Sequence, residues 1–130
     1  MRLNHIDIHV DDVAATTDFL TRHFGLKLLE MRGKAGLAIL EDDAGTEIVV
    51  SRPIEAFGGV DQASLGRVTY HLGFIQPERG DVDRLYRAIG EDGVADALAE
   101  PKEMRGGYLF YCLAPGRVLI EVGWRPPHQQ

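Results

Sequence analysis

The chain has 130 residues, of which 45% are hydrophobic, and a formal net charge of −6, which fits one small globular domain or two very small units. Lysine and arginine residues are scattered singly, so the sequence lacks the basic surface that nucleic-acid binding normally needs. No apolar run approaches the roughly 20 residues of a membrane span, and the N-terminus shows no signal-peptide pattern. We therefore expect neither a nucleic acid nor a membrane as partner. The lone Cys112 cannot form an internal disulfide, so we also expect a cytoplasmic protein.

The first predicted strand carries polar and apolar side chains on opposite faces. Side chains alternate across a strand, so Leu3–Val10 presents His5, Asp7 and His9 on one face and Ile6, Ile8 and Val10 on the other. A helix should follow directly, with Asp11 or Asp12 as its N-cap and Gly25 as its stop. This helix is expected to cover the apolar face of the strand.

Three short β-compatible runs complete the first half, at Leu26–Arg32, Leu37–Glu41 and Thr46–Ser51. Glycine and aspartate clusters separate them, which predicts a meander of hairpins. Pro53–Gly66 lacks periodicity and is expected to be a linker or a surface loop.

The order of elements then repeats. Arg67–Ile75 is strand-like, and a helix with Asp81 as cap should follow, its apolar side chains recurring at Val82, Leu85, Tyr86 and Ile89. A weaker strand is expected within Val94–Glu103, followed by a hairpin of Tyr108–Leu113 and Arg117–Trp124. The sequence therefore predicts an α+β fold of two βαβββ modules, at about residues 1–52 and 67–125, joined by a linker at 53–66 within a single domain.

The two predicted modules also match in their chemistry. His5 and His71 lie in the first strand of each module, and Glu47 and Glu121 lie in the last. Strand parity places all four on the polar side, and we expect the two modules to present them from equivalent places. They could simply solvate an open sheet face, but imidazole and carboxylate are also the ligands that Zn, Ni, Co, Mn and Fe(II) prefer. A divalent metal site is the reading that accounts for all four.

These segments resemble the vicinal-oxygen-chelate superfamily, which includes glyoxalase I, methylmalonyl-CoA epimerase, extradiol dioxygenases, fosfomycin-resistance enzymes and bleomycin-binding proteins. The likeness covers almost the whole chain and rests on LNHIDIHVDD, DFLTRHFGLKLL, TEIVV, VTYHLGF and APGRVLIEVGW. It implies a cupped mixed β-sheet around a metal, with the helices outside. By the resemblance, the ligands are His5, Glu47, His71 and Glu121, a set closest to that of glyoxalase I.

The resemblance implies a metal-dependent lyase or isomerase that acts on a small substrate with vicinal oxygens through an enediolate-type intermediate. Glu121 would be the catalytic base that removes a proton next to a carbonyl, with Glu47 as its counterpart. Two alternatives stay open: a metal-free drug-binding protein of the bleomycin-resistance type, whose low pI suits cationic ligands, and an Fe(II) extradiol-type dioxygenase. His9 stands where glutathione-dependent glyoxalases often carry Arg, so glutathione dependence also stays open.

The sequence does not assign a single role to four further residues. His9 and Asp7 share the face of His5 and could support the metal, contact substrate or line a pocket. Tyr108 and Tyr111 lie in a strand near the expected site, where tyrosines are often packing residues.

Small modules with open sheet edges also predict a homodimer.

Overall fold

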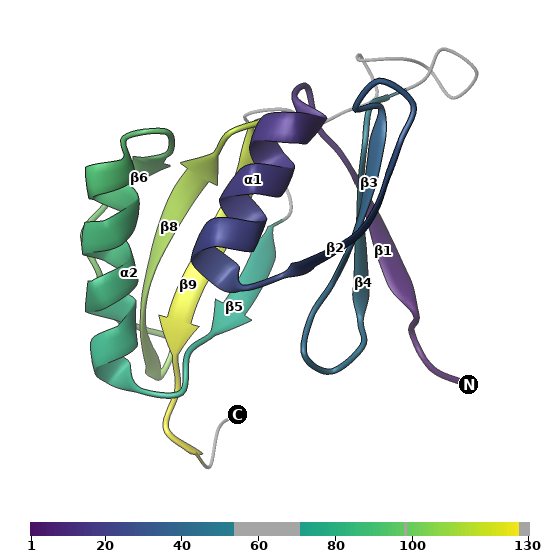
Figure 1. Cartoon of the computed structure of the whole chain (residues 1–130). Coiled ribbons are helices and arrows are strands. Elements are labelled where there is room, and N and C mark those ends of the chain that lie inside the picture. Colours follow the sequence, from purple (N-terminus) through teal and green to yellow (C-terminus); the bar gives the residue numbers. More distant parts are fainter. Residues whose placement is uncertain (54–70, 98, 128–130) are drawn as a thin grey trace. The chain divides into compact units, whose positions relative to one another are not determined.

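The computed structural model describes residues 1–53, 71–97 and 99–127. This part of the chain forms two compact units (Figure 1). The first contains β1 (His5–His9), α1 (Val13–Phe24), β2 (Lys27–Arg32), β3 (Leu37–Glu41) and β4 (Glu47–Ser51), together with the segment Pro115–Arg117. The second contains β5 (Leu72–Ile75), α2 (Arg79–Asp92), β6 (Asp96–Ala97), β7 (Lys102–Met104), β8 (Gly107–Ala114) and β9 (Val118–Trp124).

The first unit is a four-stranded mixed sheet in the order β1-β4-β3-β2, with α1 against one face. β1 pairs with β4 in parallel, and the other pairs are antiparallel. The core joins buried side chains of α1 to the even-numbered face of the strands; its members are Ile8, Val10, Val13, Phe19, Leu20, Ala38, Leu40 and Val50. The helix therefore covers the apolar face of β1, as the alternation predicts.

Both ends of α1 have local causes. The Asp12 side chain accepts a hydrogen bond from the Ala15 amide at 3.0 Å, which satisfies one of the free donors of the first turn. Gly25 ends the helix in the left-handed conformation, with φ of +66°, where a side chain would be strained. The predicted bounds of this helix are confirmed.

The start of α1 also holds the turn Pro115–Arg117. The Thr16 hydroxyl donates to the Pro115 carbonyl at 2.6 Å, and the Asp11 amide donates to the Gly116 carbonyl at 3.4 Å. Gly116 has φ of +87°, and a Cβ built there would overlap the Thr16 hydroxyl. Only glycine fits this position.

The second unit repeats the same topology. Its sheet runs β5-β9-β8-β6, with β7 also paired to β8, and β5 is parallel to β9. α2 contacts β8 and β9 through the buried Val82, Leu85 and Ile89, and the Tyr86 ring meets Phe110 edge-on with centroids 5.3 Å apart. The predicted fold class, α+β with two βαβββ modules, is confirmed.

Two local predictions in this unit need correction. Asp81 is not the N-cap of α2: Glu78 takes that position, and Asp81 accepts a hydrogen bond from its amide at 3.2 Å in a capping box. The weaker strand expected within Val94–Glu103 is split into β6 and β7, which pair with different parts of β8. Of the strand expected at Arg67–Ile75, residues 67–70 lie outside the described part, as does all of the expected linker after Pro53.

Neither helix of the described part is long and apolar enough to cross a membrane.

Candidate functional site

A buried carboxylate lies in the middle of the second sheet. Glu121 is in β9, and it is only 6% exposed. Its neighbours Ile120 and Val122 are fully buried on the face that α2 covers. Glu121 therefore points to the opposite face of the sheet, where parity predicts it. A buried carboxylate needs hydrogen-bond partners or a cation to be stable.

Two side chains on neighbouring strands approach this carboxylate. Tyr111 lies directly opposite Glu121 in β8, and its hydroxyl donates to Glu121 Oε1 at 2.7 Å. His71 immediately precedes β5, and its Nε2 lies 3.8 Å from the same oxygen. The rings of His71 and Tyr111 meet edge-on with centroids 5.4 Å apart. The hydrogen bond to Glu121 is the main reason that the pKa of Tyr111 is raised, so the phenol keeps its proton and stays a donor.

The second oxygen of Glu121 faces positions without side chains. Gly73 is its register partner in β5, and a Cβ built there would lie 3.7 Å from Glu121 Oε2. A Cβ built on Gly123, the next residue of β9 on the same face, would lie 3.9 Å from Oε2. Glycine inside a strand often marks a place where a ligand approaches closely. Oε1 is thus held by Tyr111 while the space beside Oε2 is kept clear.

The cluster opens into a pocket of about 350 Å³ within the same unit. His71 and Tyr111 line it, and Leu109 and Leu119 supply buried apolar surface. The volume is within the range of small-molecule sites, about 300–1,000 Å³. The pocket can hold one small ligand against the Tyr111 phenol and the His71 imidazole, and the Tyr111 hydroxyl is bonded to Glu121.

The pocket also borders the break between β6 and β7. β6 pairs with Leu113 and Cys112, and β7 pairs with residues from Leu109 to Gly107. Among the described residues, no strand therefore pairs with the edge of β8 around Tyr111. Ala99 and Glu100, which lie in the break, line the pocket. The interruption is therefore part of the site.

The first unit places its predicted residues on the face of its sheet opposite α1. His5 pairs directly with Glu47 across β1 and β4, and the Ser51 hydroxyl donates to Asp7 at 2.6 Å. His5 is exposed and its Nδ1 lies 3.0 Å from Asn4 Oδ1. Asp7 thus has a structural partner in Ser51.

The two predicted pairs differ in register, which corrects the expectation of equivalent placement. His5 is opposite Glu47, whereas Glu121 is opposite Gly73, two residues beyond His71. When the β1–β4 pair is superposed on the β5–β9 pair so that His5 matches His71, the position equivalent to Glu121 is Val49. Glu47 lies two residues before that position. Within the described residues, no three His, Cys, Asp or Glu side chains are grouped as a ready metal centre.

Sequence reasoning left Tyr108 and Tyr111 unassigned, and the structure separates them. Tyr108 lies on the helix side, where its hydroxyl donates to Asp83 at 2.6 Å and its ring lies 3.8 Å beneath the Arg79 guanidinium. Tyr111 faces the pocket. Because odd and even positions of a strand face opposite ways, the three-residue spacing of Tyr108 and Tyr111 could have predicted that only one of them faces the site. The sequence analysis also missed Gly73 and Gly123, although isolated strand glycines can mark close approach.

Comparison with known proteins gives the family. The model of the Glyoxalase/Bleomycin resistance protein/Dioxygenase superfamily matches residues 2–122. The chain belongs to this superfamily. A solved structure of a possible glyoxalase from Bacillus cereus is 31% identical, with a TM-score of 0.76, and the match covers 94% of this chain and 97% of the other. No curated protein matches the chain.

Two further solved structures that resemble this chain have more specific descriptions. A lactoylglutathione lyase from Agrobacterium tumefaciens is 17% identical, with a TM-score of 0.73 and coverage of 95% of this chain and 92% of that one. A fosfomycin resistance protein from Listeria monocytogenes is 22% identical, with a TM-score of 0.75 and coverage of 99% and 97%. At these identities the likeness shows the fold alone.

Proposed function

We propose that the protein is a metal-dependent lyase or isomerase of the glyoxalase type, which acts on a small substrate with vicinal oxygens. One observation carries the proposal: the buried Glu121 is held through one oxygen by Tyr111, beside His71, next to a pocket of about 350 Å³. The lactoylglutathione lyase among the similar structures supports this reaction class.

The residues present fit a divalent cation. His5, Glu47, His71 and Glu121 are the proposed ligands, because neutral imidazole and carboxylate oxygen suit Zn, Ni, Co, Mn and Fe(II). Glu121 offers Oε2 toward the space that Gly73 and Gly123 leave clear. When bound, the cation would supply Lewis-acid stabilisation of the negative charge that develops on the substrate oxygens.

The chain's own groups would move the proton. Glu121 is the proposed general base, which takes a proton from the carbon next to the substrate carbonyl and returns it to the adjacent carbon in an isomerisation. Tyr111 keeps Oε1 oriented, so Oε2 is the oxygen that would ligate the cation loosely and, when released from it, would take the substrate proton. Glu47 is proposed as the second carboxylate of the site.

The register difference favours one alternative. If Glu47 does not bind the metal, the remaining set His5, His71 and Glu121 is a two-histidine, one-carboxylate set, which is typical of non-haem Fe(II) oxygenases. An extradiol-type dioxygenase is therefore the second candidate. It predicts that Glu47→Gln retains metal and that a catechol substrate consumes oxygen.

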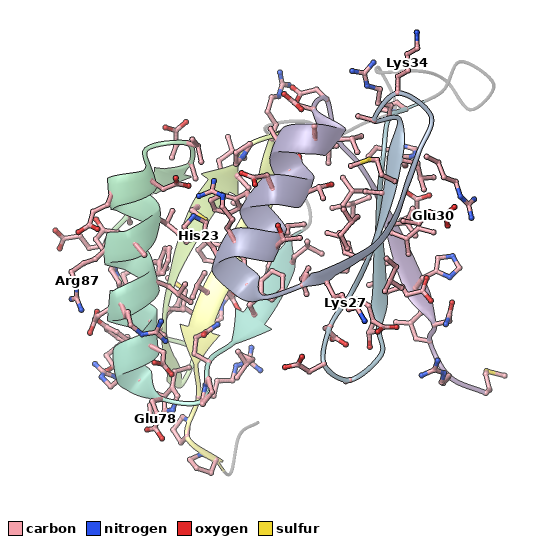
Figure 2. All side chains as sticks on the ribbon, viewed as in Figure 1. His23, Lys27, Glu30, Lys34, Glu78 and Arg87 are labelled. Carbon is pink, nitrogen blue, oxygen red and sulfur yellow. The ribbon has the colours of Figure 1, made fainter. Side chains whose placement is uncertain are left out.

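Elemental analysis followed by turnover assays tests these proposals. We expect metal in the parent and in a His23→Gln control, in which the changed imidazole lies on α1 (Figure 2), and its loss in His71→Ala and Glu121→Ala. Turnover is then measured with α-ketoaldehyde adducts, 2-substituted acyl thioesters and catechols. Isomerisation that is abolished in a metal-retaining Glu121→Gln variant supports the first candidate, and oxygen uptake supports the second.

A third outcome would contradict both enzyme proposals. If the protein takes up no metal and yet binds aromatic or cationic ligands, the four residues only line a pocket. The protein would then act as a binder of the bleomycin-resistance type.

We also propose that the protein is a homodimer. Within the part of the chain that the structure describes, no further strand pairs with β1 or β2 at the two edges of the first sheet, and β2 is exposed along its whole length. Unpaired edges of small sheets are places where a second chain can add. Light scattering over a range of concentrations tests this, and a monomer mass throughout would contradict it.

A further inference from the structure

The pocket of the second unit has a cationic side that the proposed chemistry does not use. Lys102 in β7 and Arg105 in the following turn both line it. Both side chains are exposed, and neither has a salt-bridge partner among the described residues. The nearby Glu103 is paired with Arg79 instead. Two cations therefore border the pocket in a chain whose net charge is −6.

The faces of the strands explain how these charges reach the site. Lys102 is the register partner of Leu109, and Leu109 and Tyr111 lie on the same face of β8. Met104 lies two residues after Lys102 and also lines the pocket. The cationic residues, the apolar wall and the Tyr111–Glu121 pair thus follow one another across a single sheet face.

The backbone at Arg105 gives a second, independent argument. Arg105 and Gly106 form a two-residue loop between β7 and β8, with φ of +52° and +77°. Such loops favour Asn, Asp or Gly at the first position, because a larger side chain is strained at positive φ. Ala35 and Arg117 also have positive φ, so strain alone does not indicate function. Arg105 combines the strain with a charged side chain that lines a pocket, which is where strained residues tend to be retained for a role.

We propose that this pocket binds a small organic acid, with its anionic group at Lys102 and Arg105 and its apolar body against Met104, Leu109 and Leu119. The far end of such a ligand meets His71 and Tyr111, so the inference rests on the proposed function and names the substrate class of the same site. Arg105 can hold a carboxylate through two parallel hydrogen bonds, whereas Lys102 acts as a point charge.

The negative charges in the pocket sharpen the expectation. Glu100 also lines it and is exposed, so it repels an anion and leaves the rim with a net charge of only one. Glu121 is not one of the residues that line the pocket, and its Oε1 is held by Tyr111. Recognition must therefore depend on direct contact with Lys102 and Arg105, and removing Glu100 should strengthen anion binding.

The test uses the full chain without metal and a pair of probes of nearly equal shape. Phenylacetate carries the anionic group, and phenylacetamide is its neutral counterpart. NMR titration of the ¹⁵N-labelled protein reports both the affinity and the place of binding. We expect phenylacetate to shift the amide signals of Met104, Arg105 and Tyr111, and to bind at least tenfold more tightly than phenylacetamide.

Variants separate a binding role from a structural one. Arg105→Asn should lose most of the preference for the acid and yet unfold at a higher denaturant concentration, because Asn suits the turn. Lys102→Gln should lose part of the preference, and Glu100→Gln should bind phenylacetate more tightly than the parent. The matched controls are Arg87→Gln on the outer face of α2 and Lys34→Gln in the β2–β3 turn (Figure 2), which should bind as the parent does.

Equal binding of the two probes, or shifts confined to another surface, would overturn the inference. So would an Arg105→Asn variant that keeps the full preference for the acid. Because the titration needs no metal, the two proposals fail separately. If the protein takes up metal and turns over substrate but shows no preference for the acid, only the acid-binding inference is wrong. If it prefers the acid but takes up no metal, only the proposed enzyme function is wrong.

Discussion

The Tyr111 hydroxyl donates its hydrogen to Glu121 Oε1 at 2.7 Å across two neighbouring antiparallel strands. This bond fixes the orientation of a carboxylate that is almost completely buried. A charged group in that position is stable only with such partners. Tyr111 is therefore a positioning residue for the proposed ligand and base.

Replacing Tyr111 by Phe should weaken both the fold and the metal site. The metal-free variant should lose about 1–2 kcal/mol of unfolding free energy, because a buried carboxylate loses a hydrogen bond. Its metal affinity should fall several-fold, because Glu121 is no longer held in one orientation. Urea unfolding and metal titration measure the two effects.

Tyr108→Phe is the matched control for this variant. It removes a hydroxyl that donates to Asp83 at 2.6 Å on the helix side of the same strand, so it should cost about 1 kcal/mol of stability and leave metal affinity unchanged. Equal losses of metal affinity in both variants would mean that Tyr111 acts only through the fold.

Gly73→Val should block the proposed site without unfolding the protein. Even a Cβ at this position lies 3.7 Å from Glu121 Oε2, and the branched side chain of Val extends further into that space. Val also suits a strand better than Gly does, so stability should stay within about 1 kcal/mol of the parent. Elemental analysis should show at least a tenfold loss of metal.

Gly90→Ala is a suitable control for Gly73→Val. A Cβ at Gly90 in α2 meets nothing within 4 Å, so the variant should gain about 0.5–1 kcal/mol from helix propensity. Its metal content should equal that of the parent. A full metal load in Gly73→Val would show that Oε2 is not the liganding atom.

Burial raises the pKa of the Cys112 thiol to about 12. The folded state therefore keeps this proton at pH values where the unfolded chain, with a pKa near 9, has released it. Stability from this group is present below about pH 9 and is lost as pH rises toward 12, at about 1.4 kcal/mol per pH unit. Urea unfolding between pH 8.5 and 10 should show stability falling with a slope that approaches this value in the parent, and the slope should be clearly shallower in a Cys112→Ala variant.

Gly116→Ala should be among the most destabilising small substitutions in the described part. It combines a φ of +87° with an overlap between the new Cβ and the Thr16 hydroxyl, and together these should cost about 2–4 kcal/mol. Thermal unfolding measures the loss. A Thr16→Ala, Gly116→Ala double variant should recover part of it, because the overlapping hydroxyl is gone; no recovery would assign the whole loss to the backbone.

Alternation along each strand predicted the faces correctly. Ile8 and Val10 are buried beneath α1, while His5 and Asp7 lie on the other face of β1. In β9, Glu121 lies on the face opposite to that of the buried Ile120. Local chemistry also predicted the ends of α1. These features depend on residues close together in sequence, so the sequence alone contains them.

Register could not be predicted in the same way. Periodicity gives the face of a residue but not how far along the strand its partner lies, because hairpin turns and long-range pairing set that distance. The offset between Glu47 and Glu121 is of this kind. The break after β6 had a local signal in Pro101, since proline cannot donate to a sheet ladder, but its relation to Tyr111 depends on the pairing with β8.

The broken edge of the second sheet has a consequence for solubility. β6 and β7 are two and three residues long, too short to template the addition of a foreign strand. The first sheet ends instead in β2, six exposed residues that include Leu28, Leu29 and Met31. In β2, a bulge between Leu28 and Glu30 interrupts the regular edge, and the charged side chains of the strand disfavour pairing with another chain. When no second chain covers β2, aggregation should therefore begin there, and the pocket edge of the second sheet should stay inert.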